Sequence, residues 1–364
     1  MEFIDLKKQY ALHRTEIDRR INAVLQHGHF IMGSEIAELE AELAKYVDVK
    51  HAITVASGTD SLEIALRAVD IGPGDEVITV PFTWISSAEV IGLVGAKPVF
   101  VDIDAQTFNI DVDQIEAAIT PRTKAIMPVS LFGQVPDMAQ INEIAAKHGV
   151  TVIEDAAQSF GATQHGKRSC GLSKIASTSF FPAKPLGCFG DGGALFTDDD
   201  KLADLMRAIR THGGERRHYH TVVGMNGRFD TIQAAVVLAK LPHFQGEVEA
   251  RSRIGARYSE LLADVCGVPA LADGNTHVYA QYTIRLPNRD AVAEKLKTEG
   301  IPTAVYYPRC LHEQPVYADL GYAWGRFPEA ERASREVLSL PMHPFLTVEE
   351  QDQVVAAVRS AVAG

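Results

Sequence analysis

One lysine lies in an unusual sequence environment. Lys184 belongs to the run STSFFPAKPLGCFGDGG, residues 177–193, where aromatic residues, prolines and glycines replace the charged neighbours of an ordinary surface lysine. Desolvation in such surroundings lowers the pKa of an amine, because it disfavours the charged form. A neutral amine is a nucleophile that can form a Schiff base. Pro185 also biases Lys184 away from helical conformation, which indicates an extended or turn geometry.

An acidic residue with complementary chemistry follows a strand-like run. Asp155 ends TVIED and is followed by Ala156, Ala157 and Gln158. A buried carboxylate needs a cationic partner or several hydrogen-bond donors. In one interpretation Asp155 merely caps the next turn. In the functional interpretation Asp155 pairs with a protonated ring nitrogen, Ala157 leaves space for a flat ring, and Gln158 reaches a ring hydroxyl.

A third feature is a small-residue turn at the start of a helical pattern. Ser57, Gly58 and Thr59 follow the run HAITVA. Free backbone N–H groups at a helix start bind phosphate, although for the turn alone an ordinary N-cap is the favoured interpretation. A phosphate site, an acid for a pyridinium nitrogen and a desolvated lysine are together what pyridoxal 5′-phosphate (PLP) requires. Trp84 is then either a residue that stacks on the cofactor ring or an ordinary core aromatic.

These residues need an α/β scaffold to bring them together. Short β-rich runs between residues 51 and 155 alternate with helical segments such as 34–46 and 137–147. Runs that are apolar on both faces, with helices between them, predict a mostly parallel sheet covered on both sides. Ligands of such sheets bind beyond the carboxyl ends of the strands. STSFF and GALFT follow with a glycine-rich connection, which predicts two antiparallel additions to the sheet.

The pattern changes near Pro242. We expect separate helices before it (231–241) and after it (247–263), followed by strands in VYAQYTIRL and IPTAVYY, a helix near Ala291 and terminal helices. The sequence therefore predicts a large α/β domain over residues 1–242 and a smaller α+β domain over residues 243–364.

Composition excludes several classes of protein. The 364 residues carry a formal net charge of −12, which opposes the broad basic surface of a nucleic-acid binder. The four cysteines are far apart and predict neither a zinc site nor a disulfide framework. The chain contains no signal-like start and no apolar run of about 18 residues. We expect a cytoplasmic protein without metal and without a membrane span.

Two motifs suggest other functions. The triplet DID, Asp102–Asp104, matches the acid pair of metal-dependent glycosyltransferases, but acids in a solvated turn at a strand end are the favoured interpretation. His218 and His220 alternate in HGGERRHYH, which suits a metal site, a basic loop that touches a nucleotide diphosphate, or a solvated loop. The segment GCFGDGG precedes a strand rather than a helix, so dinucleotide binding is disfavoured.

Five longer motifs carry a family resemblance. SGTDSL, EDAAQSFGA, SFFPAKPLGCFGDGGALFT, GMNGRFDTIQAA and LSLPMHP resemble, in this order, the motifs of the DegT/StrS-type sugar-nucleotide aminotransferases. The resemblance extends over nearly the whole chain. It implies the PLP-dependent transferase fold type I, as in aspartate aminotransferase, and a homodimer with active sites at the subunit interface.

The resemblance also implies roles for individual residues. Lys184 is the Schiff-base lysine, and Asp155 is the partner of the pyridinium nitrogen. The other implied cofactor contacts are Gln158 at the ring hydroxyl, Gly58, Thr59 and Ser179 at the phosphate, Trp84 stacked on the ring, and Asn226 reaching the phosphate from the neighbouring subunit. An amino donor, most often glutamate, converts PLP to the pyridoxamine form, which then aminates a keto sugar. Family members that dehydrate sugars lack the lysine, so its presence also disfavours a non-catalytic sensor.

The substrate class follows from finer resemblances. EFIDLKKQ, SFFPAKPLGC, NGRFDTIQAA and VYAQYTIR are most similar to members that aminate the 3-keto group of a UDP-linked N-acetylated hexuronic acid, a precursor of bacterial surface polysaccharide. Arg228 suits the uronate carboxylate; its alternative is an ion pair with Asp230. Tyr306, Tyr307 and Gly227 depart from the residues common in relatives near the sugar pocket. Another dTDP-3-keto or NDP-4-keto sugar therefore remains the alternative substrate.

Overall fold

A parallel-rich sheet forms the centre of the computed structural model, which describes residues 1–216 and 218–363. Within these residues the sheet has seven strands in the order β1-β9-β8-β5-β4-β2-β3. Their bounds are β1 (His51–Val55), β2 (Glu76–Thr79), β3 (Lys97–Phe100), β4 (Thr123–Ile126), β5 (Thr151–Asp155), β8 (Ile175–Ser179) and β9 (Gly193–Thr197).

Only one of the two predicted antiparallel additions is correct. β9 pairs antiparallel with both β1 and β8. The STSFF run lies in and just after β8, however, and β8 pairs parallel with β5. Residues 156–174 separate these strands and are long enough for the crossover that a parallel neighbour requires. Part of this connection forms the short hairpin of β6 (Thr163–Gln164) and β7 (Lys167–Arg168).

Helices cover both faces of the sheet, as predicted. The α-helices of the described residues are α1 (Leu6–His27), α2 (Ser34–Val47), α3 (Gly58–Ala68), α4 (Ser86–Leu93), α5 (Ile115–Ala118), α6 (Met138–His148), α7 (Asp200–Arg210), α8 (Thr231–Leu262), α9 (Arg289–Thr298), α10 (Pro328–Glu336) and α11 (Val348–Ala363), of which α9 and α11 pack on a second, smaller sheet. Adjacent strand residues alternate between two cores: Ala52 packs with α2 and α8, whereas Ile53 packs with α3, α4 and α7. This alternation is the strand periodicity of a doubly covered sheet.

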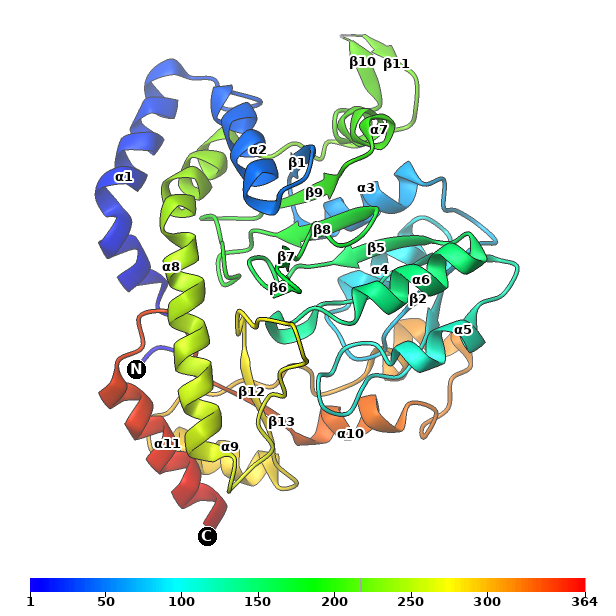
Figure 1. Cartoon of the computed structure of the whole chain (residues 1–364). Coiled ribbons are helices and arrows are strands. Elements are labelled where there is room, and N and C mark those ends of the chain that lie inside the picture. Colours follow the sequence, from blue (N-terminus) through cyan, green and yellow to red (C-terminus); the bar gives the residue numbers. More distant parts are fainter. Residues whose placement is uncertain (217, 364) are drawn as a thin grey trace.

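Helix α8 does not break at Pro242, contrary to the prediction of two helices. It runs continuously from Thr231 to Leu262 with Pro242 inside it. Proline in a helix interior costs a hydrogen bond, but tertiary packing supports this helix along its length. Figure 1 shows α8 beside α1 at one end and beside α11 at the other, and both helices contact it. The division into domains 1–242 and 243–364 stays a prediction.

The C-terminal part contains a second, smaller sheet. β12 (Tyr282–Arg285) pairs antiparallel with β13 (Val337–Leu340) over a separate apolar core that α9 and α11 complete. The predicted strand IPTAVYY is wrong: its one recorded bridge is between Ala304 and Ser339. The strand that pairs with β12 is β13, which includes Leu338–Leu340 at the start of the LSLPMHP motif. No helix in the described ranges combines the length and apolarity needed to cross a bilayer.

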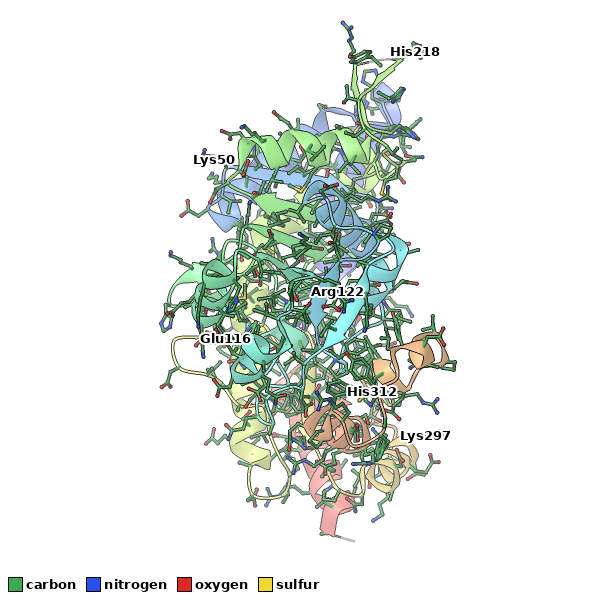
Figure 2. The ribbon with its side chains drawn as sticks, turned by 90° about the vertical axis from the view of Figure 1, so that its right-hand side faces the viewer. Lys50, Glu116, Arg122, His218, Lys297 and His312 are labelled. Atoms are coloured by element: carbon green, nitrogen blue, oxygen red, sulfur yellow. The ribbon has the colours of Figure 1, made fainter. Side chains whose placement is uncertain are left out.

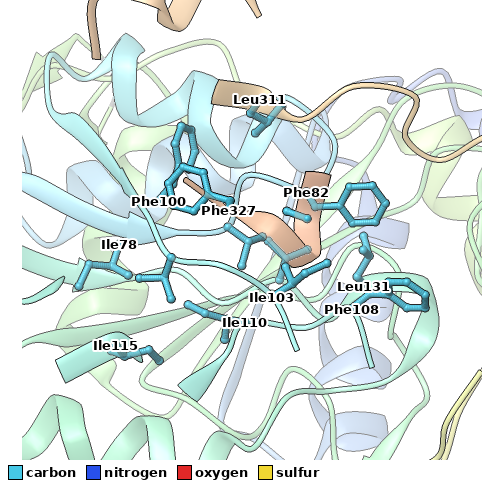
Figure 3. Packing of buried hydrophobic residues seen from close by; sticks show 14 of the residues in the cluster. Ile78, Phe82, Phe100, Ile103, Phe108, Ile110, Ile115, Leu131, Leu311 and Phe327 are labelled. Atoms are coloured by element: carbon cyan, nitrogen blue, oxygen red, sulfur yellow. The ribbon is translucent and has the colours of Figure 1, made fainter. Parts of the chain in front are cut away.

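The acids of the DID triplet have structural roles. Asp102 is buried, and its carboxylate accepts hydrogen bonds from the backbone N–H groups of Glu329 and Ala330 at 3.0 and 2.9 Å, at the start of α10. The adjacent core joins β3 to the C-terminal part, with Phe100 and Phe327 at a ring-centroid distance of 6.2 Å (Figure 3). The expectation of a solvated turn is therefore wrong for Asp102, which caps a helix.

We expect Asp102→Ala to lower the free energy of unfolding by about 1–2 kcal/mol, because α10 loses a buried N-terminal cap. Asp104→Ala is the matched control, since its exposed carboxylate binds only its own turn, and we expect a smaller loss. Denaturant unfolding with and without Mg²⁺ checks this. Stabilisation of the unaltered chain by Mg²⁺ that disappears in Asp102→Ala would instead favour the metal interpretation.

Candidate active site

Parallel strands place several of the predicted site residues at one edge of the sheet. Asp155 is the last residue of β5, and Ser179 is the last residue of β8. Gly58 lies three residues beyond the end of β1, and Trp84 lies five residues beyond the end of β2. Because β1, β2, β5 and β8 run in the same direction, their carboxyl ends share this edge, where ligands of such sheets bind.

Asp155 is a buried carboxylate with two local donors. Its side chain accepts a hydrogen bond from Ser87 Oγ at 2.7 Å and one from the Ala157 backbone N–H at 3.2 Å. Burial raises the pKa of Asp155, and these two hydrogen bonds and the positive charge of Lys184 oppose that rise. The arrangement leaves a desolvated acid that gains from a cationic partner.

Lys184 lies close enough to Asp155 for the two charges to interact. Burial lowers the pKa of Lys184, and the charge of Asp155 opposes that effect. Its backbone N–H donates to the Phe181 carbonyl at 2.8 Å, which fixes the turn predicted between the two prolines. A desolvated amine beside a buried carboxylate is suited to nucleophilic and proton-transfer chemistry at neutral pH.

The turn after β1 forms a narrow cradle. Ser57 caps α3 by accepting a hydrogen bond from the Asp60 N–H at 3.0 Å, so the N-cap interpretation is correct whatever else the turn binds. A Cβ atom at Gly58 would lie 2.7 Å from Ser179 Cβ, which explains the glycine. The Thr59 and Ser86 hydroxyls are 2.9 Å apart. Hydroxyls and helix N–H groups thus converge where a phosphate fits.

A polar and aromatic wall adjoins Asp155. Gln158 is buried, accepts a hydrogen bond from the Phe132 N–H at 2.8 Å, and donates from Nε2 to the Tyr307 hydroxyl at 3.3 Å. The rings of Trp84 and Tyr307 lie 6.2 Å apart, and Trp84 is 59% exposed. Trp84 is therefore not an ordinary core aromatic. Tyr306 extends the wall, with its ring 5.8 Å from that of Tyr307.

The segment with Asn226 and Arg228 lies beside the end of β1. The Ala56 N–H donates to the Gly227 carbonyl at 2.9 Å. Asn226 is exposed, and no side-chain hydrogen bond joins it to another described residue. Arg228 Nε is buried without a hydrogen-bond partner, and within residues 1–216 and 218–363 Arg228 forms no ion pair with Asp230. The ion-pair alternative is therefore not observed.

The described histidines of the HGGERRHYH segment lie on or next to a short hairpin. The hairpin consists of β10 (Gly214–Arg216) and β11 (Tyr219–His220), and Figure 2 shows His218 at its outer end. Arg217 lies outside the described residues. Across the described part of the chain, no cluster of histidine, cysteine or acidic residues could hold a metal ion.

Ser87 contacts the candidate site without having been predicted there. The sequence shows a serine near Trp84, but its bond to Asp155 joins residues 68 positions apart. Lys240 was also missed, because its position in a regular helical pattern predicts no contact with the Lys184 loop. Hydroxyls and lysines on helices are common, so residue type alone could not single out either side chain.

The fold and this cluster define a PLP-dependent aminotransferase of fold type I. The chain belongs to the DegT/DnrJ/EryC1/StrS aminotransferase family, whose family model matches residues 12–359. A curated relative, UDP-2-acetamido-2-deoxy-3-oxo-D-glucuronate aminotransferase of Pseudomonas aeruginosa, is 52% identical over 359 residues, which cover 98% of this chain and 99% of the relative.

Two solved structures extend the similarity to the fold and the cofactor. DesV of S. venezuelae, in complex with a ketimine intermediate, has a TM-score of 0.98 at 40% identity and covers 100% of this chain and 98% of its own. NtdA of Bacillus subtilis, with bound cofactor PMP, has a TM-score of 0.91 at 33% identity, covering 97% and 82%. The cofactor of this protein is PLP, and the cradle at Gly58, the Asp155 carboxylate and the Lys184 amine fit its phosphate, ring and aldehyde.

We expect Gly58→Ala to lower the free energy of unfolding by about 1–3 kcal/mol and to weaken PLP binding, because the added methyl group overlaps Ser179. Gly92→Ala is the control, since nothing lies within 4 Å of its added Cβ. The double variant Gly58→Ala/Ser179→Gly should regain much of the lost stability. Denaturant unfolding and PLP titration measure both effects, and equal behaviour of the two single variants would contradict the close approach.

Proposed function

We propose that this protein transfers the amino group of glutamate to the 3-keto group of a UDP-linked 2-acetamido-2-deoxy-hexuronic acid. The observation that carries the proposal is the 52% identity, over almost the full length of both chains, to an aminotransferase named for such a substrate. The unpartnered, buried Nε of Arg228 supports it independently, because a guanidinium without a carboxylate partner suits an acidic sugar.

We assign the proton transfers to Lys184. PLP, when bound, supplies an electron sink for the negative charge that develops on the substrate carbon. Lys184 Nζ would hold the cofactor and, when free of it, would act as the base that carries a proton between Cα of the amino donor and the cofactor. Its lowered pKa favours the neutral amine that this role requires. Asp155 keeps a proton on the ring nitrogen, and Ser87 orients its carboxylate.

The remaining residues bind and orient. Gly58, Thr59 and Ser179 hold the phosphate, and Asn226 adds a contact from the neighbouring subunit. Gln158 contacts the ring hydroxyl and Trp84 stacks on the ring. Tyr306, Tyr307 and Arg228 face the sugar. In this assignment the second substrate enters the same site after the amino donor has left as a 2-oxo acid.

A homodimer with shared active sites completes the proposal. The exposed apolar residues Phe30, Ile31, Phe181 and Phe189 support it, because an interface with a second copy of the chain would remove large apolar side chains from water. The Phe30 carbonyl accepts a hydrogen bond from the Thr231 N–H, so this segment lies at the start of α8. We place the enzyme in the cytoplasm, in the synthesis of a bacterial surface polysaccharide such as lipopolysaccharide O-antigen.

Borohydride reduction of the holoenzyme should attach the cofactor covalently to the peptide that contains Lys184. Lys184→Ala should lose this label and at least about 10³-fold in kcat, because both the covalent anchor and the proton carrier are absent. Lys174→Ala, an exposed lysine of the preceding segment, is the control and should retain both. Peptide mass spectrometry and 2-oxoglutarate release measure these outcomes; a labelled Lys184→Ala protein would refute the assignment.

A panel of UDP- and dTDP-linked 3-keto and 4-keto sugars, offered with glutamate, tests the substrate. We expect the acidic UDP-3-keto sugar to give the highest kcat/KM. Arg228→Ala should reduce that value by roughly 10- to 100-fold, the worth of a hydrogen bond to a charged group, and affect neutral sugars much less. Arg228→Lys, which keeps the charge, should lose less. Conversion of neutral 4-keto sugars alone would replace the uronate with the alternative substrate and leave the aminotransferase assignment intact.

A further inference from the structure

Lys240 is a buried cation that the proposed chemistry does not use. It lies on α8 with 2% of its surface exposed, and its Nζ donates to the Gly187 carbonyl at 2.7 Å. The same Nζ lies 4.5 Å from the centroid of the Phe189 ring. Burial lowers the pKa of Lys240 to about 8, although nearby Glu247 and Cys188 oppose this effect. Burying an ammonium group is costly, so its contacts with residues 187 and 189 need an explanation.

These contacts fall on the loop that carries Lys184. The Cys188 N–H donates to the Phe180 carbonyl at 2.7 Å, which closes the loop at its base. A Cβ atom at Gly187 would lie 2.5 Å from the Pro182 carbonyl oxygen, so the returning chain passes against the outgoing one. Lys184 therefore lies inside a compact closed loop whose shape depends on residues 187–189.

A second residue of α8 forms a hydrogen bond with the same loop. Gln233 Oε1 accepts a hydrogen bond from the Phe189 N–H at 2.7 Å. Gln233 and Lys240 are seven residues apart, about two helical turns, and so lie on one face of α8. Lys240 binds the backbone at Gly187, just before Cys188, and Gln233 binds it at Phe189, just after Cys188.

The loop backbone determines where the Lys184 amine points. Within residues 1–216 and 218–363 no hydrogen bond or ion pair holds the Lys184 side chain itself. Only burial and the charge of Asp155 act on the pKa of its amine. We propose that Gln233 and Lys240 form a clasp on α8, and that both are positioning residues for Lys184. The proposal rests on the assigned role of Lys184, and it gives α8 a function beyond packing.

The test is the rate at which full-length, cofactor-free protein forms the yellow Schiff base with added PLP. We expect Lys240→Met and Gln233→Leu each to slow this rate by about tenfold or more, because an unclasped loop presents the amine in the correct position for less of the time. Lys240→Arg keeps a cationic donor and should recover most of the rate. Hydrogen exchange at the Lys184 and Cys188 amides should quicken in the two slow variants.

Lys8→Met is the matched control. Lys8 Nζ also donates to a backbone carbonyl, that of Phe345 at 2.9 Å, which is not part of the loop. An unchanged rate in Gln233→Leu and in folded Lys240→Met, or an equal fall in Lys8→Met, would overturn the clasp. If Lys240→Met does not fold, Gln233→Leu decides. Absence of label at Lys184 in the unaltered holoenzyme would instead refute the lysine's role, which separates the two failures.

Discussion

The structure depends on keeping an amine and a carboxylate out of water at the same edge of the sheet. Burial shifts the pKa of Lys184 down and that of Asp155 up, so each group is driven toward its neutral form, and the charge of each opposes the shift in the other. The pair is consequently sensitive to any cation or anion that enters between them. A pyridinium nitrogen would supply a cation to Asp155, and a bond to the cofactor would convert the Lys184 amine to an imine.

Several elements separated in sequence meet this constraint together. The backbone of Asp155 is fixed on both sides by the segment after β4, since its N–H donates to the Pro128 carbonyl and its carbonyl accepts from the Ser130 N–H. The adjacent Glu154 faces the other side of the strand, where Ser130, Ser169 and the Cys170 N–H satisfy its carboxylate. Strand alternation thus separates two neighbouring buried acids, one with structural donors and one left available for a ligand.

The sequence was most informative where chemistry and local pattern agree. The common direction of β1, β2 and β5, the turn at Gly58 and the apolar surroundings of Lys184 all follow from short-range signals. The parallel pairing of β8 with β5 was not predicted. The second strand of the small sheet was placed wrongly: it is β13, which pairs with β12, and not the IPTAVYY run. Both segments are apolar and β-rich, and nothing local distinguishes them. α8 continues through Pro242 for a similar reason, since packing against α1 and α11 outweighs a local helix-breaking preference.

The site divides into a rigid part and a more open part, and this division bears on specificity. The cofactor side is defined by close backbone contact: Cβ atoms at Gly58 and Gly193 would lie 2.7 and 2.6 Å from their neighbours. The residues assigned to the sugar side are less constrained, because Tyr306 and Tyr307 are only half-buried and Arg228 Nε has no hydrogen-bond partner among the described residues. A substitution on the sugar side changes few contacts within the chain. A larger residue at Gly58 or Gly193 would instead push neighbouring strand or turn backbone aside. A shared cofactor chemistry with varied sugar preference is the expected consequence of such an arrangement.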